Sequence, residues 1–240
     1  DKINFIKFLT YTQNILSDDS KPNFFSVAWS LSVEEWFYIL LPLTILIGTK
    51  LKIKAFDLNL VNICVVTIIT LNLFRLYYNN IDVNWGEDIR RSVLLRLDSL
   101  CFGVIAYFLK DKIKLHYVYL LIILTVAPLI YLTTKPLLIS SSLFFQNLFI
   151  PLCSICFSSI LIVLTFVNST SKILKKISMN GANMSYSMYL FHIFFIPITV
   201  NLFDNVILSL FVYLIFLKLF CWIFFRIFEK PLLDTRPNYI

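Results

Sequence analysis

Seven long apolar runs, separated by short polar breaks, dominate the chain. An α-helix needs about 20 apolar residues to cross the hydrocarbon core of a bilayer, which is roughly 30 Å thick. None of the runs alternates with a period of two, so they predict helices and not the strands of a membrane barrel. The chain is 59% hydrophobic and 15% charged, with a mean hydropathy of +0.81, whereas soluble domains carry about 25% charged residues. The sequence therefore predicts an all-α, polytopic membrane helix bundle.

The predicted transmembrane helices are residues 24–48, 58–78, 93–109, 115–133, 143–167, 184–203 and 205–228. The chain has no internal repeat, no low-complexity tract and no linker rich in Pro or Gly. We therefore expect residues 1–240 to form a single membrane domain. The longest stretches predicted outside the spans on the outer side are residues 1–23 and 79–92, and we expect them to shape an extracellular mouth.

The basic residues between the spans predict the orientation of the chain. One side carries twelve of them: Lys50, Lys52, Lys54, Lys110, Lys112, Lys114, Lys172, Lys175, Lys176, Arg226, Lys230 and Arg236. The opposite side carries six, together with seven acidic residues. Because basic loops stay in the cytoplasm, we expect the C-terminus inside and the N-terminus outside. A chain that starts outside without a cleavable signal needs earlier spans, so we expect a missing N-terminal part.

Neither a metal site nor a nucleic-acid site is indicated. The five cysteines all lie in apolar runs, and the Cys153–Cys156 pair has no second ligand pair, so buried packing thiols are the favoured interpretation. The histidines, His116 and His192, are far apart in the sequence. The net charge of +7 arises in short loops between spans, where the topology of the membrane explains it.

Two adjacent carboxylates, Glu34 and Glu35, stand at the head of the first predicted span. An ionised carboxylate inside a bilayer is costly, so it must face a partner or a wet cavity. The helical period puts Glu34 and Tyr38 on one face and turns Glu35 by about 100°. We expect one of the two acids to face the protein interior. The alternative is that both lie shallow enough to reach water and headgroups.

The third predicted span carries Arg96 and Asp98, which point about 160° apart on a helix and so cannot pair with each other. Arg96 instead shares a stripe with Ser99 and Gly103. Counted from the cytoplasmic end of each span, Glu34 stands about 21 Å up and Arg96 about 20 Å up. Equal depth and opposite charge predict an ion pair between Glu34 and Arg96.

The sixth predicted span has a polar stripe. Ser185, Tyr189 and His192 fall on one helical face, while Tyr186 points elsewhere. At a depth of about 12 Å, His192 is able to bond across helices or to handle a proton. The alternative is a packed histidine whose nitrogens are satisfied by neighbouring helices. The stripe favours a lined cavity.

Four motifs resemble the integral-membrane acyltransferases that include bacterial O-antigen, exopolysaccharide and peptidoglycan O-acetylases, the acyltransferase 3 family. They are WSLSVEEWFY at 29–38, RLDSLCFG at 96–103, SYSMYLFH at 185–192 and FEKPL at 228–232. They occur in the family's order and spread over most of the chain. One departure is Trp36, where the family commonly has Gln.

The resemblance implies a multi-pass enzyme of the bacterial inner membrane, which transfers an acyl group, usually acetyl from cytoplasmic acetyl-CoA, to a hydroxyl of a cell-surface glycan such as lipopolysaccharide. It implies about ten spans, of which this chain lacks roughly the first three, with the family's His and Arg in the first span. The fragment alone is therefore expected to be inactive. We assign Glu34 and His192 to catalysis, and Glu34 would orient or charge the missing histidine. Glu35, Tyr38, Arg96, Asp98, Ser185, Tyr186 and Tyr189 would line the site.

The basic loop residues Lys172, Lys175 and Lys176 are the candidate contacts for the phosphates of acyl-CoA, although a role as topology signal alone explains them as well. Membrane lipid and a glycan acceptor are the other expected partners. Two other functions stay open. Intramembrane charges and kinked helices also suit a transporter, and the chain also fits a non-catalytic remnant of the acyltransferase. The sequence leaves the glycan, its hydroxyl, the acyl group and the oligomeric state undetermined.

Overall fold

The structure, a computed structural model, describes residues 2–16, 27–51, 56–79, 84–167, 171–203 and 205–235. Helices make up most of these ranges, which contain no strand, so the chain is an all-α polytopic bundle as predicted. The helices group into two compact units, residues 1–167 and 168–240.

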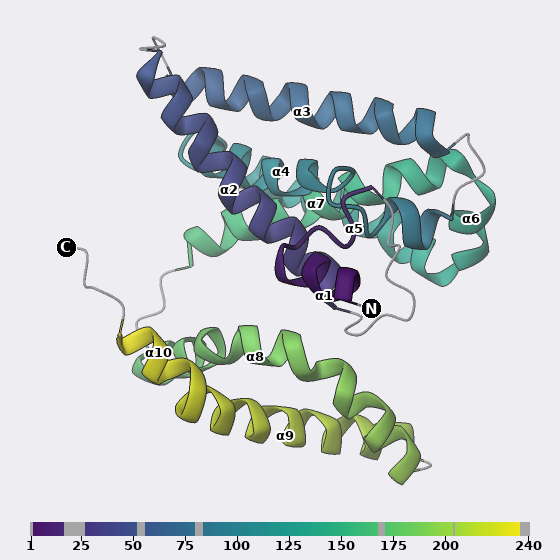
Figure 1. The fold of residues 1–240 in the computed structure, drawn as a ribbon, viewed down its shortest axis with the longest axis vertical. Coiled ribbons are helices and arrows are strands. Elements are labelled where there is room, and N and C mark those ends of the chain that lie inside the picture. Colours follow the sequence, from purple (N-terminus) through teal and green to yellow (C-terminus); the bar gives the residue numbers. More distant parts are fainter. Residues whose placement is uncertain are drawn as a thin grey trace. The chain divides into compact units, whose positions relative to one another are not determined.

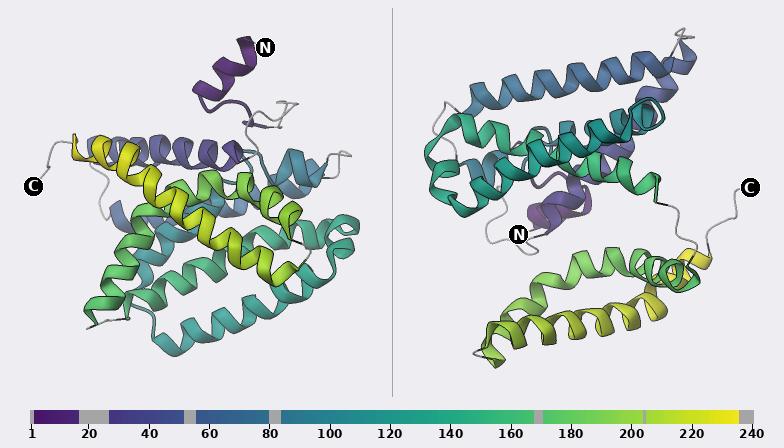
Figure 2. Two further views of the ribbon diagram at one scale, coloured as in Figure 1. Left: turned by 90° about the horizontal axis from the view of Figure 1, so that it is seen from below. Right: turned by 180° about the vertical axis from the view of Figure 1, so that it is seen from behind.

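The first unit is built around α7, which packs against α5 and α4, while α3 packs against α4 (Figures 1 and 2). Its elements are α1 (Lys2–Leu9), α2 (Ala28–Lys50), α3 (Phe56–Asn79), the π-helical turn η1 (Trp85–Ile89), α4 (Leu97–Leu109), α5 (Leu115–Thr134), α6 (Pro136–Ser141) and α7 (Leu143–Thr165). Large apolar side chains cover much of its exterior, for example Leu124 and Ile123 on α5, which are 58% and 65% exposed. Such an exterior suits a hydrocarbon solvent.

The second unit is a hairpin of two long helices, α8 (Lys172–Leu202) and α9 (Val206–Phe224) (Figure 1). The π-helical turn η2 (Phe225–Glu229) and α10 (Lys230–Asp234) continue α9. Met184 on α8 packs against Leu217 and Cys221 on α9. Phe191 contacts Phe220 and Phe224 in edge-to-face geometry, with ring centroids 4.9 Å apart in both pairs, an arrangement that adds attraction beyond buried area.

Each of the seven predicted spans corresponds to a helix, and six helices in the described residues are long and apolar enough to cross a membrane. The exception is α4, whose 13 residues reach about 20 Å at 1.5 Å per residue. The predicted boundaries are wrong at two places. The span predicted from residue 93 begins as a helix only at Leu97, and the span predicted from residue 184 belongs to a helix that starts at Lys172.

The late start of α4 is explained by the segment that precedes it. Residues 90–96 form turns, and the backbone N–H groups of Val93 and Leu94 donate to the carbonyls of Asn14 and Ile15 at 2.8 and 3.1 Å. These N–H groups therefore bond to the N-terminal segment and not to a helix. Ile89, Val93 and Leu95 are at most 1% exposed. Non-helical backbone beside membrane spans is tolerated where protein buries it in this way.

Some sequence predictions fall on residues outside the described ranges. These are residues 24–26 at the start of the first predicted span, and the loop charges Asp1, Asp18, Asp19, Lys21, Lys52, Lys54, Asp82, Asp204 and Arg236.

Candidate functional site

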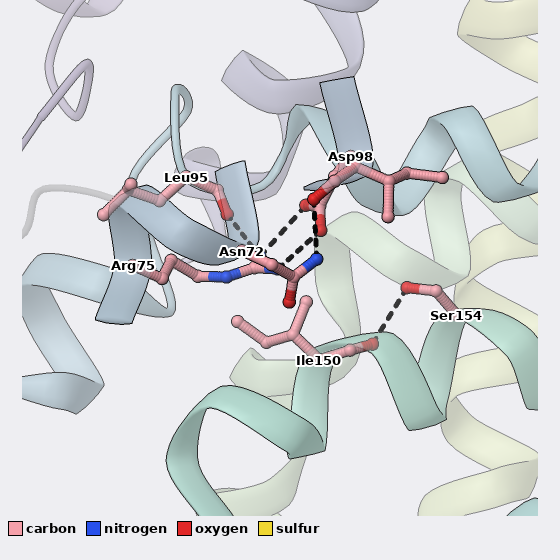
Figure 3. A network of polar contacts seen from close by, with 7 residues as sticks. Asn72, Arg75, Leu95, Asp98, Ile150 and Ser154 are labelled. Atoms are coloured by element: carbon pink, nitrogen blue, oxygen red, sulfur yellow. Dashed lines mark hydrogen bonds and ion pairs between the residues drawn. The ribbon is translucent and has the colours of Figure 1, made fainter. Parts of the chain in front are cut away.

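A buried ion pair joins α3 to the first turn of α4 (Figure 3). The two guanidinium nitrogens of Arg75 contact the two carboxylate oxygens of Asp98 at 2.6 and 3.0 Å, and Arg75 also donates to the carbonyl of Leu95 at 2.7 Å. Arg75 is 1% exposed and Asp98 is fully buried. Two parallel charge-assisted hydrogen bonds fix both position and angle, so this pair sets the rotation of α4 about its axis.

That rotation turns the opposite face of α4 towards a cavity. The sequence prediction that Asp98 does not pair with Arg96 and takes its partner from another helix is confirmed, and Arg96, Ser99 and Gly103 line one cavity together. The cavity, which we call the α4–α7 cavity, has a volume of about 440 Å³. It is lined by Trp29, Arg90, Arg96, Ser99, Leu100, Gly103, Phe149, Cys153, Ser154, Phe157, Ser158 and Leu161.

The cation-bearing end of this cavity has polar groups without partners. Within the described residues, the Arg90 Nε and the Ser99 Oγ are buried and make no hydrogen bond. The Arg96 guanidinium lies over the ring of Trp29, 5.9 Å from its centroid, and makes no ion pair with any acid that the structure describes. A ring face attracts a cation but does not neutralise it. Arg90 and Arg96 of the α4–α7 cavity therefore form no direct ion pair with a carboxylate that the structure describes.

The predicted ion pair between Glu34 and Arg96 is wrong: within the described ranges no such contact exists. Glu34 and Tyr38 lie exposed on one face of α2, and Glu35 is half-buried. The comparison of depths failed because it ignored the direction of the side chains, and because Arg96 precedes α4 instead of lying inside a helix. Arg75, which pairs with Asp98, was not predicted as a site residue. The sequence feature that indicated such a role is its position as a single arginine inside the apolar run 58–78.

The first motif is anchored by the N-terminal segment. The Gln13 side chain donates to Ser32 Oγ at 2.6 Å, and the Trp36 indole N–H donates to the carbonyl of Tyr11 at 2.9 Å. Trp36 thus binds the backbone of the N-terminal segment through its one polar atom. Asn14 donates to the carbonyls of Trp29 and Arg91, so residues 11–15 hold the first turns of α2 beside the mouth of the α4–α7 cavity.

In the second unit, the third and fourth motifs meet. Ser187 on α8 is fully buried and donates from Oγ to the Glu229 carboxylate in η2. Sequence reasoning did not assign either residue to the site. Ser185 and Tyr186 lie on exposed faces of α8, and the Ser185 hydroxyl bonds within its own helix to the carbonyl of Ala182 at 2.7 Å.

His192 and Tyr189 are neighbours on α8, as the spacing predicts. The Nδ1 of His192 lies 2.6 Å from the backbone carbonyl of Tyr189, and the two rings are 5.7 Å apart. Because a carbonyl only accepts hydrogen bonds, the neutral imidazole carries its proton on Nδ1. The Nε2 lone pair is then left to take a proton from another group.

A second polar cavity, of about 350 Å³, lies in the second unit beside the end of α9. Its lining includes Asn180 and Asn183 from α8, and Arg226, Lys230 and Asp234 from the C-terminal elements. The predicted cofactor contacts Lys172, Lys175 and Lys176 are exposed on the first turns of α8. The helical period places Lys172 and Lys176 on the same face as Asn180, so a basic surface leads along α8 to this cavity.

In the part of the chain that the structure describes, no three His, Cys, Asp or Glu side chains are placed to hold a metal ion. All five cysteines are free thiols. Four are buried, and Cys153 is half-buried against the α4–α7 cavity.

Long apolar helices, a buried ion pair between α3 and α4, and cavities with polar side chains in their lining define a multi-pass helical membrane protein. A family model described as an acyltransferase domain matches residues 2–226. The chain belongs to this family, the acyltransferase 3 family. No curated protein and no solved structure matches the chain.

Proposed function

We propose that the protein transfers an acyl group, acetyl in the simplest case, from a cytoplasmic acyl-CoA to a hydroxyl of a cell-surface glycan such as O-antigen, exopolysaccharide or peptidoglycan. The observation that carries this proposal is the family match, which extends through both units of the chain. The bacterial inner membrane and a cytoplasmic C-terminus complete the proposal, supported by the bias of basic residues towards one side of the spans.

Acyl transfer to a hydroxyl begins when a base takes the proton of the glycan hydroxyl, whose oxygen then attacks the thioester carbonyl carbon. The tetrahedral oxyanion that forms then collapses. The carbon–sulfur bond breaks, and the CoA thiolate takes up a proton. His192 suits proton transfer because its Nδ1 is committed to the carbonyl of Tyr189. In this proposal Glu34 orients or charges a partner histidine, and Arg96 neutralises charge on the substrate.

The acyl donor would meet the basic surface of the second unit. Lys172, Lys175 and Lys176 attract the phosphates of CoA, and the cavity lined by Arg226 and Lys230 offers further donors. Tyr189 and His192 would line the passage of a substrate, with Ser185 and Tyr186 on neighbouring faces. Glu35 and Tyr38 would lie beside Glu34, and Asp98 acts on the site through Arg75 by holding α4 in place.

The direct test uses the full-length protein in proteoliposomes with acetyl-CoA labelled in its acetyl group and a polysaccharide acceptor. We expect label to become covalently attached to the glycan and to be released as acetate by mild alkali, as an ester requires. Accumulation of labelled substrate inside the vesicles without covalent attachment would identify a transporter instead. Absence of both would fit a non-catalytic remnant.

The role of His192 is tested in the same assay. Loss of a positioned base lowers rates by about 100-fold or more, so we expect His192→Gln to reduce acyl transfer by at least that factor. His116→Gln is the matched control, because His116 is the other histidine and is exposed near the start of α5. A wild-type rate for His192→Gln would show that His192 is only a packed side chain.

A further inference from the structure

The α4–α7 cavity does not end at its polar mouth. A smaller cavity of about 200 Å³ follows it along the same two helices. The two share Gly103 and Leu161, so together they form one groove, which we call the α4–α7 groove. Arg90 and Arg96 lie at one end, and Lys110 lies at the other, its ammonium 4.5 Å from the centroid of the Tyr107 ring.

The wall of the groove is apolar and open on one side. Phe157 and Leu161 on α7 are 66% and 56% exposed, and Tyr107 on α4 is 64% exposed. A Cβ built on Gly103 would meet no atom within 4 Å, so the middle of the groove is open space. Over α4 the groove runs for about 20 Å at 1.5 Å per residue, longer than half of the roughly 30 Å hydrocarbon core. One hydrocarbon chain therefore fits along it.

The arginine end selects for a negative charge. The acids nearest in sequence are bonded elsewhere: Glu87 pairs with Arg91, Asp88 accepts from the backbone N–H of Asn84, and Asp98 pairs with Arg75. Within the described residues, the Nε of Arg90 and the Oγ of Ser99 thus make no hydrogen bond, and Arg96 forms no ion pair with a carboxylate. Guanidinium groups bind phosphate oxygens with paired, charge-assisted hydrogen bonds.

We propose that the α4–α7 groove binds a phosphate-bearing membrane lipid, with its phosphate held by Arg90, Arg96 and Ser99 and one of its chains lying along the wall from Leu100 to Ile162. Moving a chain from bilayer to groove exchanges one apolar surrounding for another and provides little driving force. Selectivity therefore comes from the phosphate and its arginines, and the groove provides length and direction. The proposal concerns binding alone and does not depend on acyl transfer.

Native mass spectrometry of the full-length protein, titrated with phosphatidylglycerol in detergent, tests this proposal. We expect the wild type to retain phosphatidylglycerol and to release diacylglycerol with the same chains. The double variant Arg90→Gln/Arg96→Gln should weaken retention by at least about tenfold, because it removes charge-assisted bonds. Lys112→Gln/Lys114→Gln is the charge-matched control, on an exposed loop at the other end of α4, and should match the wild type.

A second variant tests the contribution of the lipid's hydrocarbon chain separately from that of its phosphate, with thermal unfolding as the check on folding. The Cβ of Gly103→Leu meets no atom within 4 Å and its side chain extends into the groove, so we expect unchanged thermal unfolding of the protein and weaker retention of phosphatidylglycerol. Inorganic phosphate should compete only weakly. Three results would overturn the proposal: equal retention of diacylglycerol, wild-type retention by both variants, or displacement by inorganic phosphate as effective as by the lipid, which would define a free-anion site.

Discussion

Asp98 and Arg75 form a contact whose energetic weight is testable residue by residue. Replacing one member of a buried ion pair leaves the other charge unpaired, at a cost of about 3–5 kcal/mol. We therefore expect Asp98→Asn to lower the free energy of unfolding by about that amount, measured as thermal loss of helical circular dichroism in detergent. Asp111→Asn removes an exposed acid from the loop after α4 and is expected to have no measurable effect.

The double variant Arg75→Met/Asp98→Leu removes the ion pair without leaving an unpaired buried charge. A buried pair replaced by apolar side chains of similar volume is often neutral in stability, so the double variant should recover much of what Asp98→Asn loses. If Asp98→Asn unfolds at the wild-type temperature, the pair does not hold α3 to α4.

At the scale of single residues, the sequence predicted which side chains share a helical face, but it did not predict which residues pair across helices. The helical period correctly separated Asp98 from Arg96 and placed Ser99 and Gly103 with Arg96. It could not name Arg75, since which helices become neighbours depends on packing between distant segments. Matching depth led to the wrong partner for Arg96, because depth along a helix does not specify the direction of a side chain.

At the scale of elements, the N-terminal segment joins α2 to the turn before α4 through Asn14, which is fully buried. The Asn14 side chain donates to the backbone carbonyls of Trp29 and Arg91, and the Asn14 backbone carbonyl accepts from the N–H of Val93. Asn14→Ala removes these two part-buried side-chain hydrogen bonds, each worth about 0.5–1.5 kcal/mol. We expect lower thermal stability and faster proteolysis within residues 84–96.

Thr10→Ala is the matched control for this prediction, because the Thr10 hydroxyl also bonds to backbone carbonyls, those of Ile6 and Lys7, but at an exposed position. It should cost much less, since water replaces the lost bonds. Equal proteolysis of Asn14→Ala and the wild type would mean that the segment does not hold the turn in place.

Hydropathy predicted the existence of the elements better than their ends. Each of the seven apolar runs contains a helix, because a helix satisfies its backbone hydrogen bonds internally, as a lipid environment requires. The missed start of α8 is polar, KILKKISMNGANM, and hydropathy identifies only the apolar part of a longer helix. The cap at Ser171, whose hydroxyl accepts from the N–H of Leu174, was the available signal. Hydropathy did not reveal that α4 is short, because Val93 and Leu94 are apolar although their N–H groups donate to the N-terminal segment.

At the scale of the whole molecule, the four motifs join in two pairs. Trp29 of the first motif lies under Arg96 of the second, within residues 1–167, and Ser187 of the third binds Glu229 of the fourth, within residues 168–240. Each unit thus contains a polar contact between motifs distant in sequence. The single domain predicted for residues 1–240 stays a prediction, as does the orientation of the chain.

The orientation is tested with cysteines placed at the two ends of α5. This helix has 20 residues, about 30 Å at 1.5 Å per residue, so its flanking residues Lys112 and Lys135 lie on opposite sides of a membrane that it crosses. Both side chains are exposed, whereas the native cysteines are buried or half-buried and give little background. We expect an impermeant maleimide to label Lys135→Cys in intact cells and Lys112→Cys only in inverted membrane vesicles. The opposite labelling would place the basic loops outside. The surface beside Lys172, Lys175 and Lys176 would then face away from cytoplasmic acyl-CoA, and the donor side of the proposed reaction would have to be reassigned.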